Sequence, residues 1–211
     1  MGFLKEGDRV VISKGHVAAI VYAMLVEMGV LSQEDLSEYP GGRLCSHLHN
    51  GAPGVDVTTG SLGHGLGTAV GMAYRMRYDG VQGTVVCVMG DGECEEGSVW
   101  ESAALAVKMH VDNVLVIVDC NGIGATDFVN PTGDLKRWSA LGWRNCEVEG
   151  HSMPSLLNAL EWAGMYRMGC PTVIVARTIK GHGVTFMENQ PMWHSRVPKG
   201  DEVVKVMEAL A

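Results

Sequence analysis

The fold is decided by residues 84–122, which read TVVCVMGDGECEEGSVWESAALAVKMHVDNVLVIVDCNG. Two short apolar runs rich in valine, Thr84 to Met89 and Asn113 to Asp119, flank a helical pattern from about Ser98 to His110. Apolar strands that alternate with helices are typical of parallel βαβ units rather than hairpins. We therefore predict an α/β fold in which a parallel sheet is flanked by helices.

The rest of the chain repeats this alternation. Further strands are predicted at Arg9 to Ser13, Cys146 to Glu149 and Thr172 to Arg177. The helix predicted at His16 to Met28 is apolar nearly all round, so we expect it to be buried. A capping box at Ser32 and Asp35 starts a short helix, and another helix runs from Pro154 until Gly169. A chain of 211 residues fits a single domain, 1–211.

Composition excludes several kinds of partner. The net charge is -8 and no run of basic residues occurs, so binding to nucleic acid is not expected. The longest apolar run, Val17 to Val26, has ten residues and is too short to cross a membrane. The first residues carry no apolar signal segment, and we predict a cytoplasmic protein.

The six cysteines include no CxxC pair, which argues against a zinc site and a disulfide framework. Most lie in apolar segments, and we expect buried, reduced thiols. Cys94 and Cys120 flank the candidate site described next.

Polar residues follow the two central strands. Gly90, Asp91 and Gly92 follow the first strand, and Asn121 follows the second. Each pattern alone is common in surface turns. However, the 28 residues between Gly92 and Asn121 hold one helix and one strand, which brings both to the same sheet edge. Carboxylate and amide oxygens suit Mg²⁺ or Ca²⁺, which completes its coordination with phosphate oxygens.

The segment from Gly90 to Gly122 resembles the thiamine-diphosphate motif of the transketolase family, which begins with Gly-Asp-Gly and ends in Asn. The resemblance implies thiamine diphosphate as cofactor and Mg²⁺, or Ca²⁺ or Mn²⁺, as metal. It implies that the side chains of Asp91 and Asn121 and the main-chain carbonyl of Ile123 bind the metal. It also implies that Gly90, Gly92 and Glu93 lie at the cofactor and that Glu96 is structural.

Further blocks resemble the family in the same order: Ser13 to His16 (SKGH), Thr58 to Gly65 (TTGSLGHG), Lys180 to Gly183 (KGHG) and Trp193 with His194 (WH). By resemblance the catalytic histidines are His16, His47 and His194. The further residues implied at the cofactor are Leu62, Gly63, His64, Lys180, His182 and His194. We expect the block from Lys180 to Ser195 to close over the cofactor.

The chain departs from the family in instructive ways. It starts just before SKGH, without the lead segment that carries a His-Pro-Gly-Gly block, and 211 residues leave no room for a pyrimidine-binding domain. His64 replaces a Gln of larger transketolases, and Ser195 replaces the Gly of WHG. The segment from Gly183 to Ser195 resembles separately encoded N-terminal halves. A C-terminal partner subunit is therefore expected, in a heterotetramer, together with self-association through the apolar flank that the partner would cover.

The implied activity is transfer of a two-carbon ketol unit between sugar phosphates. Three alternatives stay open. The chain could belong to another thiamine-diphosphate enzyme, resembling deoxyxylulose-phosphate synthase or the α subunit of a 2-oxoacid dehydrogenase. It could be a non-catalytic scaffold half. A nicotinamide-binding loop at Gly63, Gly65 and Gly67 is disfavoured because it forms no G-x-G-x-x-G after a strand.

Overall fold

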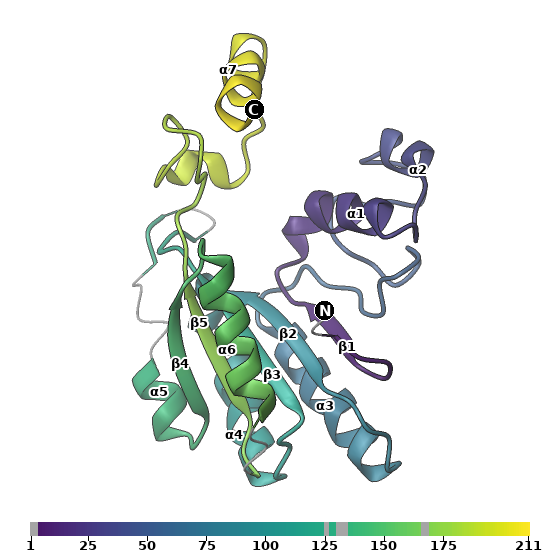
Figure 1. Ribbon diagram of the computed structural model, residues 1–211, viewed down its shortest axis with the longest axis vertical. Helices are drawn as coiled ribbons and strands as arrows, with labels where there is room; N and C mark the ends of the chain where they lie inside the picture. The colour runs from purple at the N-terminus through teal and green to yellow at the C-terminus, as the bar shows by residue number, and fades with distance from the viewer. Residues whose placement is uncertain (1–3, 125–126, 130–134, 166–168) are drawn as a thin grey trace.

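The computed structural model describes residues 4–124, 127–129, 135–165 and 169–211. They form one five-stranded sheet in the order β1-β2-β3-β5-β4, with every neighbouring pair parallel (Figure 1). The strands are β1 (Arg9–Ile12), β2 (Val85–Gly90), β3 (Val114–Cys120), β4 (Arg144–Glu149) and β5 (Thr172–Arg177). The predicted parallel α/β fold is confirmed, and each predicted strand overlaps an observed one.

Seven α-helices and three 3-10 turns connect the described strands. The helices are α1 (Ala18–Glu27), α2 (Gln33–Ser37), α3 (His64–Tyr78), α4 (Gly97–Lys108), α5 (Leu135–Ala140), α6 (Met153–Met165) and α7 (Asp201–Leu210). The 3-10 turns are η1 (Gly15–Val17), η2 (Asp91–Glu95) and η3 (Pro191–His194). The helix predicted from Pro154 is α6; residues 166–168, before Gly169, lie outside the described residues. The capping box is present, since Ser32 Oγ accepts from Asp35 N at 3.1 Å.

Helices cover both faces of the sheet, as parallel strands require. Alternate residues of β2 point to opposite faces: Val85 and Cys87 pack in the core beneath α3 and α4, while Val86 packs with Ala159 of α6. Figure 1 shows α6 lying on one face of the sheet and α7 standing apart from it. Within the described ranges no helix is long and apolar enough to cross a membrane.

The prediction that the first helix is buried is wrong for one side of α1. Ile20, Met24 and Met28 are 59%, 56% and 69% exposed, although Tyr22 and Leu25 are buried. Only the Tyr22 side packs on the small core that contains Leu25, Leu44 and Leu48. Periodicity could not reveal this because the helix is apolar on both sides. We call the exposed side, formed by Ile20, Met24 and Met28, the apolar α1 face.

The cysteines are all free. Cys87, Cys94 and Cys120 are buried as expected, and burial raises the pKa of Cys94 to about 12. Cys45, in contrast, is exposed, because it lies in the irregular segment before α3 rather than in a strand. The expectation of buried thiols is therefore correct for the strands and wrong for this loop.

Candidate functional site

A small cavity of about 60 Å³ lies at the carboxyl ends of β1, β2 and β3. Its walls come from six separate segments, which the order of the sheet brings together. The lining residues are Lys14, His16, Leu62, Gly90, Asp91, Gly92, Glu93, Asn121, Ile123, Gly124, Lys180 and His194. In open parallel sheets, ligands bind at this edge.

Asp91 and Asn121 occupy the ends of two adjacent strands. Asp91 is 4% exposed; its Oδ1 accepts from Gly92 N at 2.9 Å and its Oδ2 from Gly122 N at 2.6 Å. Asn121 Oδ1 accepts from Ile123 N at 3.0 Å. Gly122 has φ of +74°, a conformation that turns the chain back toward Asp91 and that favours glycine. The main chain therefore fixes both side chains in place.

These oxygen atoms have the chemistry of a partial site for a hard cation. No three His, Cys, Asp or Glu side chains of the described chain gather as metal ligands. A cation here would be held by the Asp91 carboxylate and neutral oxygens such as that of Asn121. Such a donor set leaves coordination positions for phosphate oxygens, the usual arrangement for Mg²⁺.

Two ammonium groups balance the acidic side of the cavity. The buried Lys14 Nζ forms an ion pair with Asp119 Oδ2. Burial would raise the pKa of Asp119, but Lys14 and the hydroxyl of Thr178 outweigh it and lower that pKa. Burial, together with the charge of Lys14, lowers the pKa of Lys180, although Asp119 and Asp91 oppose this. Two lysines beside a cavity at a sheet edge attract an anion.

Lys14 is a site residue that the sequence analysis did not single out. It lies in the SKGH block, between Ser13 and His16, and that block was the available signal. Its ion pair with Asp119 joins residues 105 positions apart, so no local pattern could show it.

Two histidines line the cavity on the side of η1 and η3. The ring centroids of His16 and His194 are 4.9 Å apart. Burial, then the charges of Lys14, His194, Lys180 and His47, lowers the pKa of His16 to about 4. Burial, then Lys180 and Lys14, lowers the pKa of His194. His194 Nδ1 is buried and meets no hydrogen-bond partner among the described residues, so a ligand could satisfy it.

Four residues of the predicted set do not line the cavity. His47 and His64 are exposed, and His64 is the first residue of α3. Gly63 donates its N–H to Glu93 Oε1 at 3.0 Å. His182 is exposed and stacks on His151, with ring centroids 3.8 Å apart. The structure therefore brings together ten of the predicted residues: His16, Leu62, Gly90, Asp91, Gly92, Glu93, Asn121, Ile123, Lys180 and His194.

Glu93 ties three segments together beneath the cavity. Its side chain is 2% exposed; Oε1 accepts from Ser13 Oγ and Gly63 N, and Oε2 accepts from Gly90 N at 3.0 Å. The ends of β1 and β2 and the start of α3 thus share one carboxylate. Each donor depends on it, because an unpaired buried polar group is costly.

We expect Glu93→Ala to lower the free energy of unfolding by about 3 kcal/mol, because two main-chain N–H groups and one hydroxyl lose their acceptor. Urea denaturation followed by circular dichroism measures this change. Glu95→Ala in the same turn is the control, since Glu95 is exposed. Equal stability of the two variants would contradict the structural role of Glu93.

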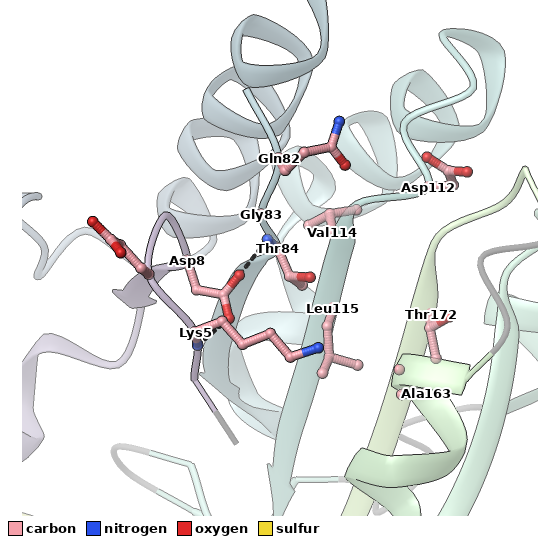
Figure 2. A pocket seen from close by; sticks show the side chains of 12 residues that line it. Lys5, Asp8, Gln82, Gly83, Thr84, Asp112, Val114, Leu115, Ala163 and Thr172 are labelled. Atoms are coloured by element: carbon pink, nitrogen blue, oxygen red, sulfur yellow. Dashed lines mark hydrogen bonds between the residues drawn. The ribbon is translucent and has the colours of Figure 1, made fainter. Parts of the chain in front are cut away.

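A second cavity, of about 290 Å³, lies at the opposite, amino ends of the strands (Figure 2). Its walls include Lys5, Asp8, Thr84 and Thr172. The Asp8 carboxylate already accepts from Thr84 N at 2.7 Å and from Lys5 N at 2.8 Å. This carboxylate joins the first described residues to the sheet, and none of the sequence motifs reaches the cavity. The carboxyl edge therefore remains the candidate site.

The fold and the site define a parallel α/β domain that presents oxygen ligands, two lysines and two histidines at one sheet edge. Residues 4–211 match the family model described as transketolase, thiamine diphosphate binding domain. The chain belongs to this family.

Relatives of known name agree with this assignment. The chain is 40% identical to human transketolase-like protein 2, covering 97% of this chain and 34% of the relative. It is 38% identical to an apulose-4-phosphate transketolase subunit of Actinobacillus succinogenes, covering 97% and 76%. The crystal structure of Campylobacter jejuni transketolase superposes with a TM-score of 0.85 at 31% identity, covering 95% and 34%. The chain thus spans about a third of the two larger proteins.

Proposed function

We propose that this chain is the thiamine-diphosphate-binding subunit of a transketolase and transfers a two-carbon ketol unit between sugar phosphates together with a separate C-terminal subunit. The observation that carries the proposal is the single cavity that joins Asp91 and Asn121 to Lys14 and Lys180. The similarity to the apulose-4-phosphate transketolase subunit, of which this chain covers 76%, supports the division into separate chains.

The cavity fits the diphosphate end of the cofactor. Asp91 and Asn121, with the carbonyl of Ile123, would hold Mg²⁺, and Ca²⁺ or Mn²⁺ could replace it. Lys14 and Lys180 would neutralise the diphosphate. Gly90 and Gly92 allow the main chain to approach its oxygens, and Glu93 keeps that main chain in position. When bound, thiamine diphosphate supplies the carbanion chemistry that breaks a carbon–carbon bond beside a ketone.

The remaining groups would act on the sugar and on the reactive end of the cofactor. The partly exposed Leu62 can pack against an aromatic ring. His16 and His194 have lowered pKa values, so both are neutral at pH 7 and can accept a proton from a substrate hydroxyl or donate a hydrogen bond. His47 lies near enough for its charge to act on His16. Protonation of His16 would begin only near pH 4.

A partner subunit would complete the site. The apolar α1 face and the hollow of about 460 Å³ between α1 and α2 leave an apolar surface that this chain does not cover. Helix α7 likewise exposes Val204, Met207 and Leu210. We infer that a C-terminal subunit carrying the pyrimidine-binding domain covers such surfaces in a heterotetramer, and that the chain alone self-associates through them.

Reconstitution tests the proposed function. The purified chain alone should show no ketol transfer with thiamine diphosphate and Mg²⁺, because a pyrimidine-binding domain supplies the group that activates the cofactor. Mixing with the C-terminal subunit should produce turnover in a coupled sugar-phosphate assay. Sedimentation should show the self-associated chain converting to a mixed complex.

The control is the mixture made with Asp91→Asn, which should assemble without turnover. Robust turnover by the chain alone would overturn the proposal. Metal-dependent cofactor binding without turnover in the mixture would instead support a scaffold role, and condensation of pyruvate with a triose phosphate would support the synthase alternative.

A further inference from the structure

His151 lies outside the cavity but contacts the loop that carries Lys180. The parallel strands β4 and β5 end at the same sheet edge, and His151 follows β4 as Thr178 follows β5. Gly150 N donates to Arg177 O at 2.7 Å, and a Cβ on Gly150 would lie 2.4 Å from Thr178 Cγ2. Glycine at this position therefore allows the two loops to meet.

The contact itself is a hydrogen bond to the His151 ring. Ile179 N donates to His151 Nε2 at 2.7 Å. A main-chain N–H can only donate, so Nε2 must present its lone pair, and the ring is neutral with its proton on Nδ1. The other side of the ring stacks on His182 at an interplanar angle of 22°.

This bond holds the middle of a loop whose other parts are also fixed. Thr178 Oγ1 donates to Asp119 Oδ1, and Asn189 N donates to Lys180 O at 3.0 Å. Ile179 lies between these two points and directly precedes Lys180, which lines the cavity. Of the three contacts, only the one to His151 is lost when an imidazole takes up a proton.

We propose that His151 is a positioning residue that holds Lys180 at the anion-binding end of the cavity, and that protonation of His151 releases this hold. The proposal rests on the proposed function in taking diphosphate as the anion. When Nε2 is protonated it becomes a donor and faces the donor Ile179 N, so the loop separates from β4. Lys180 then loses its fixed place beside Asp91.

The charged groups around His151 are consistent with a neutral ring. From the end of β4, Glu149 Oε1 accepts the main-chain N–H of His151 at 3.2 Å. From the opposite loop, His182 stacks on the ring, and His182 Nδ1 lies 3.6 Å from Glu188 Oε1. Glu188 can stabilise a positive charge on His182. A second positive charge on the stacked His151 ring would be repelled.

Binding of thiamine diphosphate with Mg²⁺ to the full chain, measured by calorimetry between about pH 7.5 and pH 5.5, tests the proposal across the ordinary titration range of histidine. The wild type should weaken about five- to tenfold more than its His151→Gln variant, because a glutamine oxygen can accept from Ile179 N at every pH. His151→Leu should bind about five- to tenfold more weakly than the wild type at pH 7.5.

His182→Gln is the matched control, since it removes the neighbouring ring and leaves the Ile179 bond; it should keep the acid weakening of the wild type. The pKa values of His16 and His194 are lowered, so the cavity's own imidazoles change little in this window. An acid weakening in His151→Gln as large as in the wild type would overturn the proposal, as would wild-type affinity in His151→Leu.

The Ile179 amide provides a second measurement that needs neither ligand nor variant. In the labelled wild-type chain, its nuclear magnetic resonance shift should change with the titration of the His151 ring, and its protection from hydrogen exchange should fall in acid. A shift that ignores His151 would overturn the proposal. Absence of diphosphate binding at every pH would refute the proposed function, while this measurement would still decide the role of His151.

Discussion

Asp91→Asn is expected to abolish the effect of Mg²⁺ on thiamine diphosphate binding, with a loss of affinity on the order of 10² or more at saturating metal. The variant keeps the size of the side chain but removes its charge. It also places an amide donor opposite Gly92 N or Gly122 N, which now share one carboxylate. Calorimetric titration with and without Mg²⁺ measures the change.

Metal-independent binding separates this explanation from a loss of folding. In the absence of Mg²⁺ the variant should bind the diphosphate no more weakly than the wild type, because a negative charge beside an anion has been removed. Glu95→Gln removes the same charge from the same turn at an exposed position and should behave as the wild type. A wild-type response of Asp91→Asn to Mg²⁺ would show that Asp91 is no metal ligand.

His194→Ala is expected to lower turnover of the assembled enzyme by on the order of 10² while the chain remains folded. The His194 ring lines the cavity, and its buried Nδ1 meets no partner among the described residues. It is therefore available to a cofactor oxygen or a substrate hydroxyl. Removing it breaks no described hydrogen bond of that atom, and the adjacent Trp193 stays packed on Phe186.

The pH dependence gives this prediction a sign. Burial and the charges of Lys180 and Lys14 lower the pKa of His194, so the neutral ring persists below the ordinary pKa of histidine, about 6.5. Protonation of His194 should therefore not reduce wild-type turnover between about pH 7.5 and pH 6.5. Met192→Ala, beside it on η3 and exposed, is the control. Unchanged turnover and cofactor affinity in His194→Ala would assign this histidine to a solvent-facing segment.

Local patterns in the sequence were sufficient to predict the order of strands and helices. Runs of valine identify β2 and β3, and their alternation with a helix predicts parallel pairing, which is what the sheet shows. The placement of Asp91 and Asn121 at one edge follows from that pairing, since the ends of adjacent parallel strands meet there. Ten of the predicted site residues line one cavity for the same reason.

Only the tertiary structure decided which side chains meet across the fold. The ion pair of Lys14 with Asp119, the three donors gathered by Glu93 and the bond from Ile179 to His151 each join segments far apart in the chain. Periodicity reports only how a segment distributes its own apolar residues. It therefore missed that α1, apolar on both sides, is covered by its own chain on one side alone, because coverage depends on elements that pack from elsewhere.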